Sequence, residues 1–250
     1  MSRPDVLAIV QARGGSKGLP RKNLRLLRGH PLVAYSIASG LAARSITRVI
    51  MSTDDEEIAE VARAYGAEVP FMRPQDLAGD DTPDFPLFEH ALAWLARHEN
   101  YVPATVVQLR PTTPLRPRGM LDEAVRILHA DPRADSVRGV TVPKQTPYKM
   151  WRDGADGNLL PLMETSFPEP YNMPRQKLPA AYWQTGHVDA IRSTTITAAR
   201  SLTGNRVLPI MIDVNYCVDI DTLVDFDLAE RAIEQKQLDI DVPRPTSGPA

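Results

Sequence analysis

Short, continuous runs of apolar residues alternate with segments of helical spacing along most of this chain. Such runs are typical of strands buried on both faces of a sheet, because neither face of these strands reaches water. We expect strands at 6–10, 48–52, 67–72, 105–109 and 136–142. The segments between them predict helices at 31–41, 53–65, 85–97 and 119–129. This alternation predicts an α/β fold with a doubly wound, mainly parallel sheet and helices on both of its faces, joined by right-handed crossovers.

The pattern changes between residues 143 and 180, where prolines interrupt any long helix although apolar and aromatic side chains remain frequent. We therefore expect a protruding arm that packs against the active site or against a second subunit, and hence a homodimer. Strand-like alternation returns near 188–191, and a helix is expected at 221–236. A chain of 250 residues can bury one sizeable core, so a single domain over 1–241 is expected, with 242–250 as a disordered tail.

Composition excludes several classes of protein. The chain has 29 basic and 31 acidic residues, so nucleic acid is not an expected partner. A single cysteine, Cys217, excludes an intramolecular disulfide and a cysteine-rich zinc site, and its apolar surroundings favour a core position over a nucleophile. No apolar run is long enough to span a membrane, so we expect a cytoplasmic protein that does not bind membranes.

The segment after the first expected strand is rich in glycine and in cations. It reads Q-A-R-G-G-S-K-G at 11–18, and Arg21 and Lys22 follow. A loop of this kind at the carboxyl end of a strand can place backbone N–H groups around phosphate oxygens. It matches neither the G-x-G-x-x-G pattern of dinucleotide sites nor the P-loop. We interpret it as a triphosphate-binding loop of another type; the alternative is a solvated basic turn.

This loop opens a series of motifs that occur in the same order in one known family. The blocks are Q-A-R-G-G-S-K-G-L-P-R-K-N at 11–23, G-H-P-L-V-A-Y-S-I at 29–37, S-T-D-D-E-E-I at 52–58, L-R-P-T-T-P-L-R at 109–116 and V-D-I-D-T-L-V-D-F-D-L-A-E at 218–230. They resemble motifs of the acylneuraminate cytidylyltransferase family, among them I-P-A-R-x-G-S-K-x-I-x-x-K-N, S-T-D-D-x-x-I, L-Q-P-T-S-P-L-R and V-D-I-D-T-x-x-D-F-x-x-A-E. The resemblance as a whole covers residues 6–230, nearly the whole chain.

The resemblance implies a Rossmann-like nucleotidyltransferase that joins CMP from CTP to the anomeric hydroxyl of a nonulosonic acid and releases pyrophosphate. The nucleotide-binding residues that it implies are Arg13, Gly14, Gly15, Ser16, Lys22, Asn23 and Arg73. Its implied catalytic residues are Lys22, Arg13 and Asp221, with Lys22 acting on charge that develops on phosphate. Its implied substrate contacts are Gln108, Lys149, Arg175 and His187.

Asp219 and Asp221 lie two residues apart, so on an extended segment their carboxylates project to the same face. Mg²⁺ prefers carboxylate oxygens together with substrate phosphates, and we expect it as the cofactor. The alternative is that both residues serve as the cap and first-turn acids of the helix that follows.

Several assignments stay open on the sequence alone. Lys149 and Arg175 either contact the sugar carboxylate or are exposed loop charges. The family usually has N-G-x-x-Y after its arm, whereas here Thr185 stands in place of Asn, so His187 is either a substrate contact or a core histidine. The alternatives in function are a nucleotidyltransferase for another nucleotide or sugar phosphate, a GT-A-like glycosyltransferase that uses Asp219-Ile-Asp221, and a non-catalytic nucleotide-binding protein.

Overall fold

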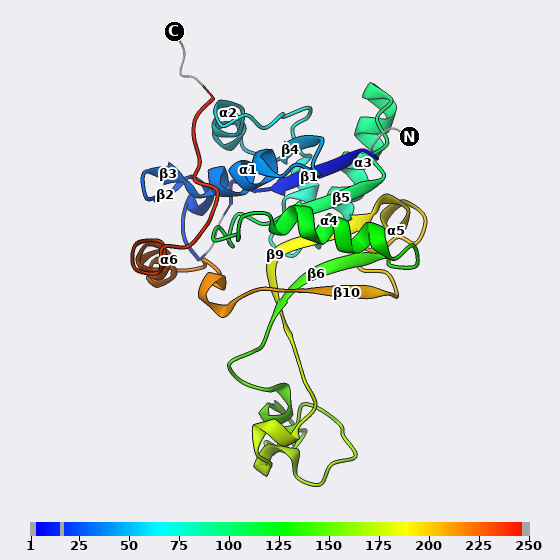
Figure 1. Cartoon of the computed structure of the whole chain (residues 1–250), viewed down its shortest axis with the longest axis vertical. Helices are drawn as coiled ribbons and strands as arrows, with labels where there is room; N and C mark the ends of the chain where they lie inside the picture. The colour runs from blue at the N-terminus through cyan, green and yellow to red at the C-terminus, as the bar shows by residue number, and fades with distance from the viewer. Residues whose placement is uncertain (1–3, 16–17, 247–250) are drawn as a thin grey trace.

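The computed structural model describes residues 4–15 and 18–246, and a six-stranded sheet forms its centre (Figure 1). The strands lie in the order β10–β6–β9–β5–β1–β4. Their bounds are β1 Val6–Gln11, β4 Arg48–Ser52, β5 Thr105–Leu109, β6 Ser136–Thr141, β9 Trp183–Arg192 and β10 Val207–Met211. Neighbouring strands are parallel except where β9 pairs with β5 and β6. The predicted α/β fold with a mainly parallel sheet is confirmed.

Helices cover both faces of this sheet. They are α1 Leu32–Ala42, α2 Glu56–Ala64, α3 Asp84–Glu99, α4 Met120–Ala130, α5 Ser193–Thr197 and α6 Leu223–Lys236. Successive side chains of a strand point to opposite faces, so β1 serves two cores. Val6, Ala8 and Val10 pack in a cluster with α1, α2 and α4, whereas Leu7 and Ile9 pack with α3 and α5. The doubly wound arrangement therefore follows from the apolar residues on both faces of β1.

The strands differ from expectation at two places. The strand expected at 67–72 is reduced to a bridge between Glu68 and Ile50. Pro70 has no N–H with which to continue that ladder. Conversely, β10 was not predicted, because Pro209 interrupts its apolar pattern. An edge strand such as β10 tolerates proline where the missing N–H faces away from its partner.

The start of α2 also differs from expectation. The N-cap is Asp55, whose Oδ1 accepts the Ile58 N–H at 3.0 Å. Thr53 instead accepts the N–H of Asp55 through its hydroxyl at 3.2 Å. The sequence S-T-D-D-E-E at 52–57 also predicts a capping box with Thr53 as the N-cap and Glu56 as its partner; that prediction is wrong, since the N-cap lies two residues later, at Asp55.

The last helix, α6, lies beside the loop that follows β1. Its N-terminus has a capping box, in which the Asp225 carboxylate accepts the Thr222 N–H at 2.8 Å and the Thr222 hydroxyl accepts the Asp225 N–H at 3.4 Å. Phe226 packs in one cluster with Leu19 and Leu27, which flank the 3₁₀ turn η1 (Lys22–Leu24). This packing brings the C-terminal part of the chain to the glycine-rich loop.

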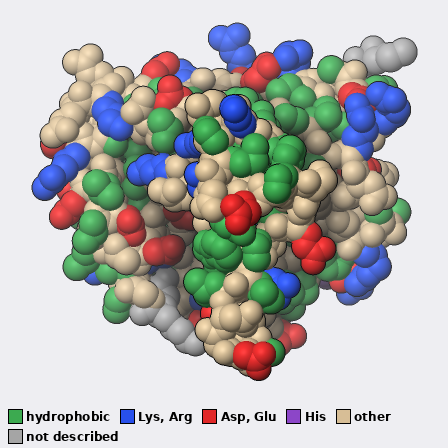
Figure 2. All heavy atoms as spheres, turned by 90° about the horizontal axis from the view of Figure 1, so that it is seen from below, with side chains coloured by type: hydrophobic (Ala, Val, Ile, Leu, Met, Phe, Trp, Pro, Cys, Tyr) green, Lys and Arg blue, Asp and Glu red, His purple; other side chains and the backbone are tan. Residues whose placement is uncertain are grey.

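Between β6 and β9 the chain leaves the sheet and forms the arm, defined here as residues 143–180 (Figure 1). The arm contains the strand pair β7 Trp151–Asp153 and β8 Leu159–Pro161 and the 3₁₀ turns η3 Pro147–Lys149, η4 Pro170–Asn172 and η5 Arg175–Lys177. Trp151 stacks on Tyr171 with ring centroids 4.5 Å apart, yet Leu159 remains 61% exposed. Figure 2 shows hydrophobic side chains gathered on the face seen from below, the side to which the arm points in Figure 1.

The chain beyond residue 241 reaches the C-terminal end of α2. Thr246 donates both its N–H, at 2.9 Å, and its hydroxyl, at 3.1 Å, to the carbonyl of Ala64. The segment expected to be a disordered tail is thus placed against the domain as far as residue 246. Within the part of the chain that the structure describes, no helix combines the length and the apolar character needed to cross a membrane.

Candidate active site

A cleft of about 490 Å³ opens at the carboxyl ends of β1 and β5. This edge is where ligands bind in open α/β sheets, because the loops after parallel strands converge there. Its charged and polar lining includes Arg13, Lys22, Asn23, Arg73, Asp80, Asp84, Arg110, Thr112 and Asp221. The predicted nucleotide residues Arg13, Lys22, Asn23 and Arg73 therefore meet the predicted metal ligand Asp221 in one place.

The glycine-rich loop is held against the segment after β4. The Gly14 N–H donates to Asp54 Oδ1 at 3.1 Å. A Cβ at position 14 would lie 2.5 Å from Asp55 Oδ2, so this close approach requires glycine, whereas a Cβ at Gly15 would meet nothing within 4 Å. Gly15 is therefore free to approach a ligand. Ser16 lies outside the described residues.

Two arginines fix the loop from different sides. Arg13 pairs through Nη2 with Asp80 Oδ1 at 2.7 Å, and its carbonyl accepts the Asn23 side-chain amide at 3.1 Å. Arg73 is only 7% exposed and donates to the Ala12 carbonyl at 2.7 Å. Arg73 thus supports the loop backbone, while the guanidinium of Arg13 stays in the cleft.

Lys22 contacts the carboxylate segment that precedes α6. Its Nζ lies 2.8 Å from Asp221 Oδ1 and 2.9 Å from the Ile220 carbonyl. Burial raises the pKa of Asp219 above its ordinary value and the nearby charge of Asp221 raises it further, against a hydrogen bond from Thr112. The charge of Asp221 therefore disfavours ionisation of Asp219, and a bound cation would offset that effect.

The donor set fits Mg²⁺. Among the described residues no group of three or more His, Cys, Asp or Glu side chains gathers as a metal site. Two carboxylates are nevertheless what Mg²⁺ usually takes from a protein when substrate phosphates complete its shell. The helix-cap alternative is wrong, because the N-cap of α6 is Thr222 and its first-turn acid is Asp225. Neither Asp219 nor Asp221 therefore caps the helix, and Asp221 is ion-paired with Lys22.

A second, more apolar cleft of about 1040 Å³ lies on the other side of the carboxylate segment. The base of the arm, residues 214–219 and α6 line it, with Asp219 in its wall. Val142, Trp183 and Leu228 supply much of its apolar surface. Cys217 also lies there, and because burial raises the pKa of its thiol it is no activated nucleophile.

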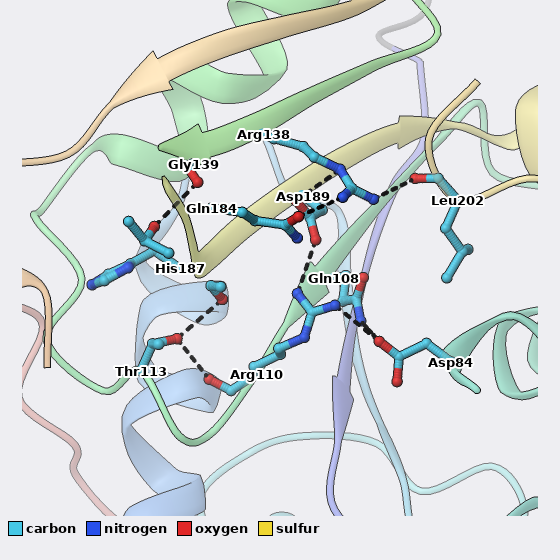
Figure 3. Close-up of polar contacts among 12 residues, drawn as sticks. Asp84, Gln108, Arg110, Thr113, Arg138, Gly139, Gln184, His187, Asp189 and Leu202 are labelled. Atoms are coloured by element: carbon cyan, nitrogen blue, oxygen red, sulfur yellow. Dashed lines mark hydrogen bonds and ion pairs between the residues drawn. The ribbon is translucent and has the colours of Figure 1, made fainter. Parts of the chain in front are cut away.

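An ion-paired network continues from the first cleft across the sheet (Figure 3). Arg110 donates to Asp84 Oδ2 and to Asp189 Oδ2, each at 2.9 Å. Burial raises the pKa of Asp84, but Arg110 and hydrogen bonds from Gln108 and Gln11 outweigh it, so the pKa lies below its ordinary value. Asp84 is therefore an ionised carboxylate at the cleft.

Two predicted substrate contacts are buried. Gln108 is 1% exposed, and its amide donates to Asp84 and Gln11 rather than facing the cleft. His187 is fully buried and its Nε2 lies 3.1 Å from the Tyr216 carbonyl. Burial, with a contribution from Arg116, lowers the pKa of His187 to about 4. The structure thus places His187 in the core, as the alternative stated, and gives Gln108 a supporting position.

The two predicted arm residues lie away from the first cleft. Neither Lys149 nor Arg175 is among the described residues that line it. Arg175 donates to the carbonyls of Pro143 and Lys144, at 2.5 and 3.2 Å, and so closes the base of the arm. Within one chain these two residues are therefore remote from Lys22.

Sequence reasoning missed Gln11, Asp84 and Arg110, and it noted Asp189 as a polar residue on an expected strand but left its role open. A signal was present for Arg110, which stands in the quoted L-R-P-T-T-P-L-R block where the family motif has Gln. No local pattern marks Asp84, since it follows a loop of ordinary polar residues and becomes the first residue of α3.

Comparisons with known proteins agree with this geometry. The family model of cytidylyltransferases matches residues 7–146. The CMP-N,N'-diacetyllegionaminic acid synthase of Legionella pneumophila is 32% identical over 93% of this chain and 97% of its own length. The N-acylneuraminate cytidylyltransferase of Escherichia coli is 30% identical over 94% of this chain, which spans only 53% of that protein.

The fold has counterparts among solved structures. CMP:2-keto-3-deoxy-manno-octonic acid synthetase, solved in complex with CTP, superposes with a TM-score of 0.66 over 93% of this chain and 99% of its own, at 14% identity. At that identity the likeness concerns the fold alone. The family model, which matches more than half of the chain, and the likeness to the Legionella protein over nearly the whole of both chains show the family as well as the fold. The chain therefore belongs to the cytidylyltransferase family.

Proposed function

We propose that this enzyme transfers CMP from CTP to the anomeric hydroxyl of a sialic-acid-like nonulosonic acid, releasing pyrophosphate, with Mg²⁺ as cofactor. The contact between Lys22 and Asp221 carries the proposal. Inside the first cleft it joins a phosphate-type loop to Asp221 from the other end of the chain, while Asp219, the second carboxylate of the proposed Mg²⁺ pair, lies in the wall of the second cleft. A glycosyltransferase that used the two aspartates alone would not need the loop residues that meet them here.

In the proposed mechanism the triphosphate lies along the loop, where backbone N–H groups and Arg13 bind it. Mg²⁺ on Asp219 and Asp221 would neutralise charge on the α-phosphate and lower the pKa of the attacking hydroxyl. When CTP binds, the Lys22 ammonium group leaves its contact with Asp221 and binds phosphate oxygens instead. There it stabilises the charge that develops as pyrophosphate leaves. The hydroxyl attacks directly, so no covalent enzyme intermediate is needed.

We also propose a homodimer in which the arm reaches the partner, so that Lys149 or Arg175 serves the partner's acceptor. The exposed apolar side chains of the arm support this, because they are left uncovered within one chain. The use of one cysteine in 250 residues is consistent with a reducing cytoplasm, where we place the reaction.

The test is pyrophosphate release from CTP, UTP, ATP and GTP with Mg²⁺ and a panel of acceptors. The panel contains neuraminate-, legionaminate- and pseudaminate-type acids together with an aldose phosphate. We expect release only with CTP and a nonulosonic acid, and little with Lys22→Ala. Release that requires another nucleotide or the aldose phosphate would disprove the proposed function while leaving the nucleotidyltransferase class intact.

A further inference from the structure

The network in Figure 3 is arranged as a row across the sheet. Arg138 on β6 is the direct neighbour of Asp189 on β9, which is the direct neighbour of Gln108 on β5. Arg110 follows Gln108 by two residues, and Gln11 lies two residues beyond the β1 partner of Gln108, so all these side chains share one face. This is the face covered by α3, whose first residue is Asp84.

Asp189 is the buried centre of the row. It is fully buried, accepts from Arg110 at 2.9 Å and lies 3.6 Å from Arg138 Nε. Burying a carboxylate is costly unless it is paired, so Asp189 and the two arginines depend on one another. Asp84, on the cleft side, accepts from Arg110, Gln108 and Gln11. Two carboxylates thus balance two guanidinium groups.

This chain departs from the quoted family motifs at the positions that meet in this network. Gln11 stands where I-P-A-R has Pro, and Arg110 where L-Q-P-T-S-P-L-R has Gln. Asp189 stands where N-G-x-x-Y has Tyr. Three separate sequence differences therefore meet in one connected structural feature.

One end of this network lies in the first cleft, where we propose that the reaction takes place. Arg110 and Thr112 both line the cleft, and the Thr112 carbonyl accepts the Ile220 N–H at 2.8 Å, between the two aspartates assigned to the metal. A ligand group bound to Arg110 would therefore lie in the same cleft as Asp221, where we propose that the acceptor hydroxyl meets the α-phosphate. The loop after β1, by contrast, holds the cations assigned to the triphosphate.

The charge balance restricts what Arg110 can bind. A substrate carboxylate beside Arg110 would also lie beside the ionised Asp84 and be repelled. Two of the five guanidinium N–H groups are used by Asp84 and Asp189, which leaves donors for a ligand oxygen. Asp84 beside them offers acceptor oxygens. A donor next to an acceptor suits a neutral substituent that both accepts and donates hydrogen bonds.

We propose that Arg110, with Asp84, selects the acceptor by binding a neutral hydroxyl or N-acylamino substituent of the sugar acid, and that Asp189 is the positioning residue that orients Arg110. This rests on the proposed function, because it names the part of the acceptor that the site reads. The carboxylate of the acceptor is then bound elsewhere.

The experiment distinguishes an effect on acceptor binding from an effect on CTP binding. kcat and KM are measured for the acceptor at saturating CTP, and for CTP at saturating acceptor, in wild type, Arg110→Gln, Arg110→Lys, Asp189→Asn and Arg110→Gln/Asp189→Asn. The acceptors are N-acetylneuraminate and two analogues with hydroxyl or hydrogen in place of the acetamido group. Arg200→Gln is the control, since Arg200 is an exposed arginine paired with Glu89 outside the cleft.

We expect each single variant to raise the acceptor KM by about 10–100-fold, as for loss of a charged hydrogen bond, with the CTP KM changed less than about twofold. The double variant should lose less than the product of the single losses, because both residues act through one guanidinium. The acceptor analogue with hydrogen should lose affinity in wild type but not in Arg110→Gln. The wild-type KM values for N-acetylneuraminate and for the hydroxyl analogue then show whether Arg110 and Asp84 prefer an acetamido group or a hydroxyl group.

Other results overturn the inference. A CTP KM that rises as much as the acceptor KM assigns Arg110 to the nucleotide, and multiplicative losses in the double variant remove the positioning role of Asp189. Arg110→Lys keeps the charge balance and remains informative if a neutral variant does not fold, as judged by thermal melting. If wild type releases no pyrophosphate with any acid, the proposed function fails, and this inference fails with it.

Discussion

Lys22 connects the two halves of the active site at the scale of single residues. Its Nζ touches Asp221 although 199 positions separate them. Because we assign Lys22 to charge that develops on phosphate, Lys22→Ala should lower kcat by about 10²–10³ and change the acceptor KM little. Steady-state kinetics of pyrophosphate release measure this. An unchanged kcat removes Lys22 from the mechanism, and Lys236→Ala, on the surface of α6, is the control.

Asp221 is the carboxylate that a cation would reach from the cleft. Asp221→Asn keeps the shape of the side chain and removes its charge, so activity should fall at least about 100-fold while the protein stays folded. Titration of activity with Mg²⁺ should show a higher requirement for the metal. If the apparent Mg²⁺ affinity is unaltered and extra Mg²⁺ restores no activity, the metal assignment is wrong.

His187 predicts a dependence of stability on pH. Its pKa is lowered to about 4 in the folded chain, against about 6.5 unfolded, so between these values the unfolded chain binds a proton that the native chain does not. Stability should therefore fall as the pH drops from about 6.5 to about 4, by about 3 kcal/mol from this residue.

The comparison variant is His187→Gln, which keeps a donor for Tyr216 and removes the titration. Urea unfolding at pH 7 and pH 4.5 should show a smaller pH-dependent loss in this variant than in wild type. The exposed His98, changed to Gln, serves as the control. Equal losses in wild type and His187→Gln would mean that other groups set the pH dependence.

At the scale of elements, the capping box of α6 also holds the segment 219–221, which we propose to bind Mg²⁺. The Asp225 carboxylate accepts the N–H of Thr222 and that of Asp221, the latter at 3.1 Å. Thr222→Ala should cost about 1 kcal/mol of unfolding free energy and should also raise the Mg²⁺ requirement, because the cap holds the Asp221 backbone. Asp227→Ala, on the exposed side of the same helix, should do neither. If Thr222→Ala lowers the stability but leaves the Mg²⁺ requirement unchanged, the helix cap does not influence the proposed Mg²⁺ ligands.

The elements that sequence predicted well are those whose residues carry a local signal. Buried runs such as Val6–Gln11 predict a central strand, and the loop after it predicts a phosphate site. The polar network was out of reach, because it depends on the register of β5 against β9 and of β9 against β6. Gln108 and Arg110 are two residues apart on one face, and only the position of the strand end decides which of them meets the cleft.

At the scale of the whole molecule, we predict a homodimer. Light scattering should report twice 27.7 kDa, and specific activity should fall on dilution below the dimer Kd. Leu159→Glu, in the exposed part of the arm, should shift the protein toward monomer, whereas Val102→Glu, at an exposed position before β5, should not. A fully active monomer of 27.7 kDa would instead make the arm a lid over its own site.

The arm connects two strands that are already hydrogen-bonded neighbours, β6 and β9. Topologically it is an enlarged hairpin loop, so the sheet can close whatever the arm contains. The entropy of closing such a loop grows only with the logarithm of its length, at about 0.6 kcal/mol for each doubling. The length of this connection can therefore change without disturbing the sheet that carries the nucleotide cleft, so the demands on the arm come from the contacts it makes and not from the closure of the fold.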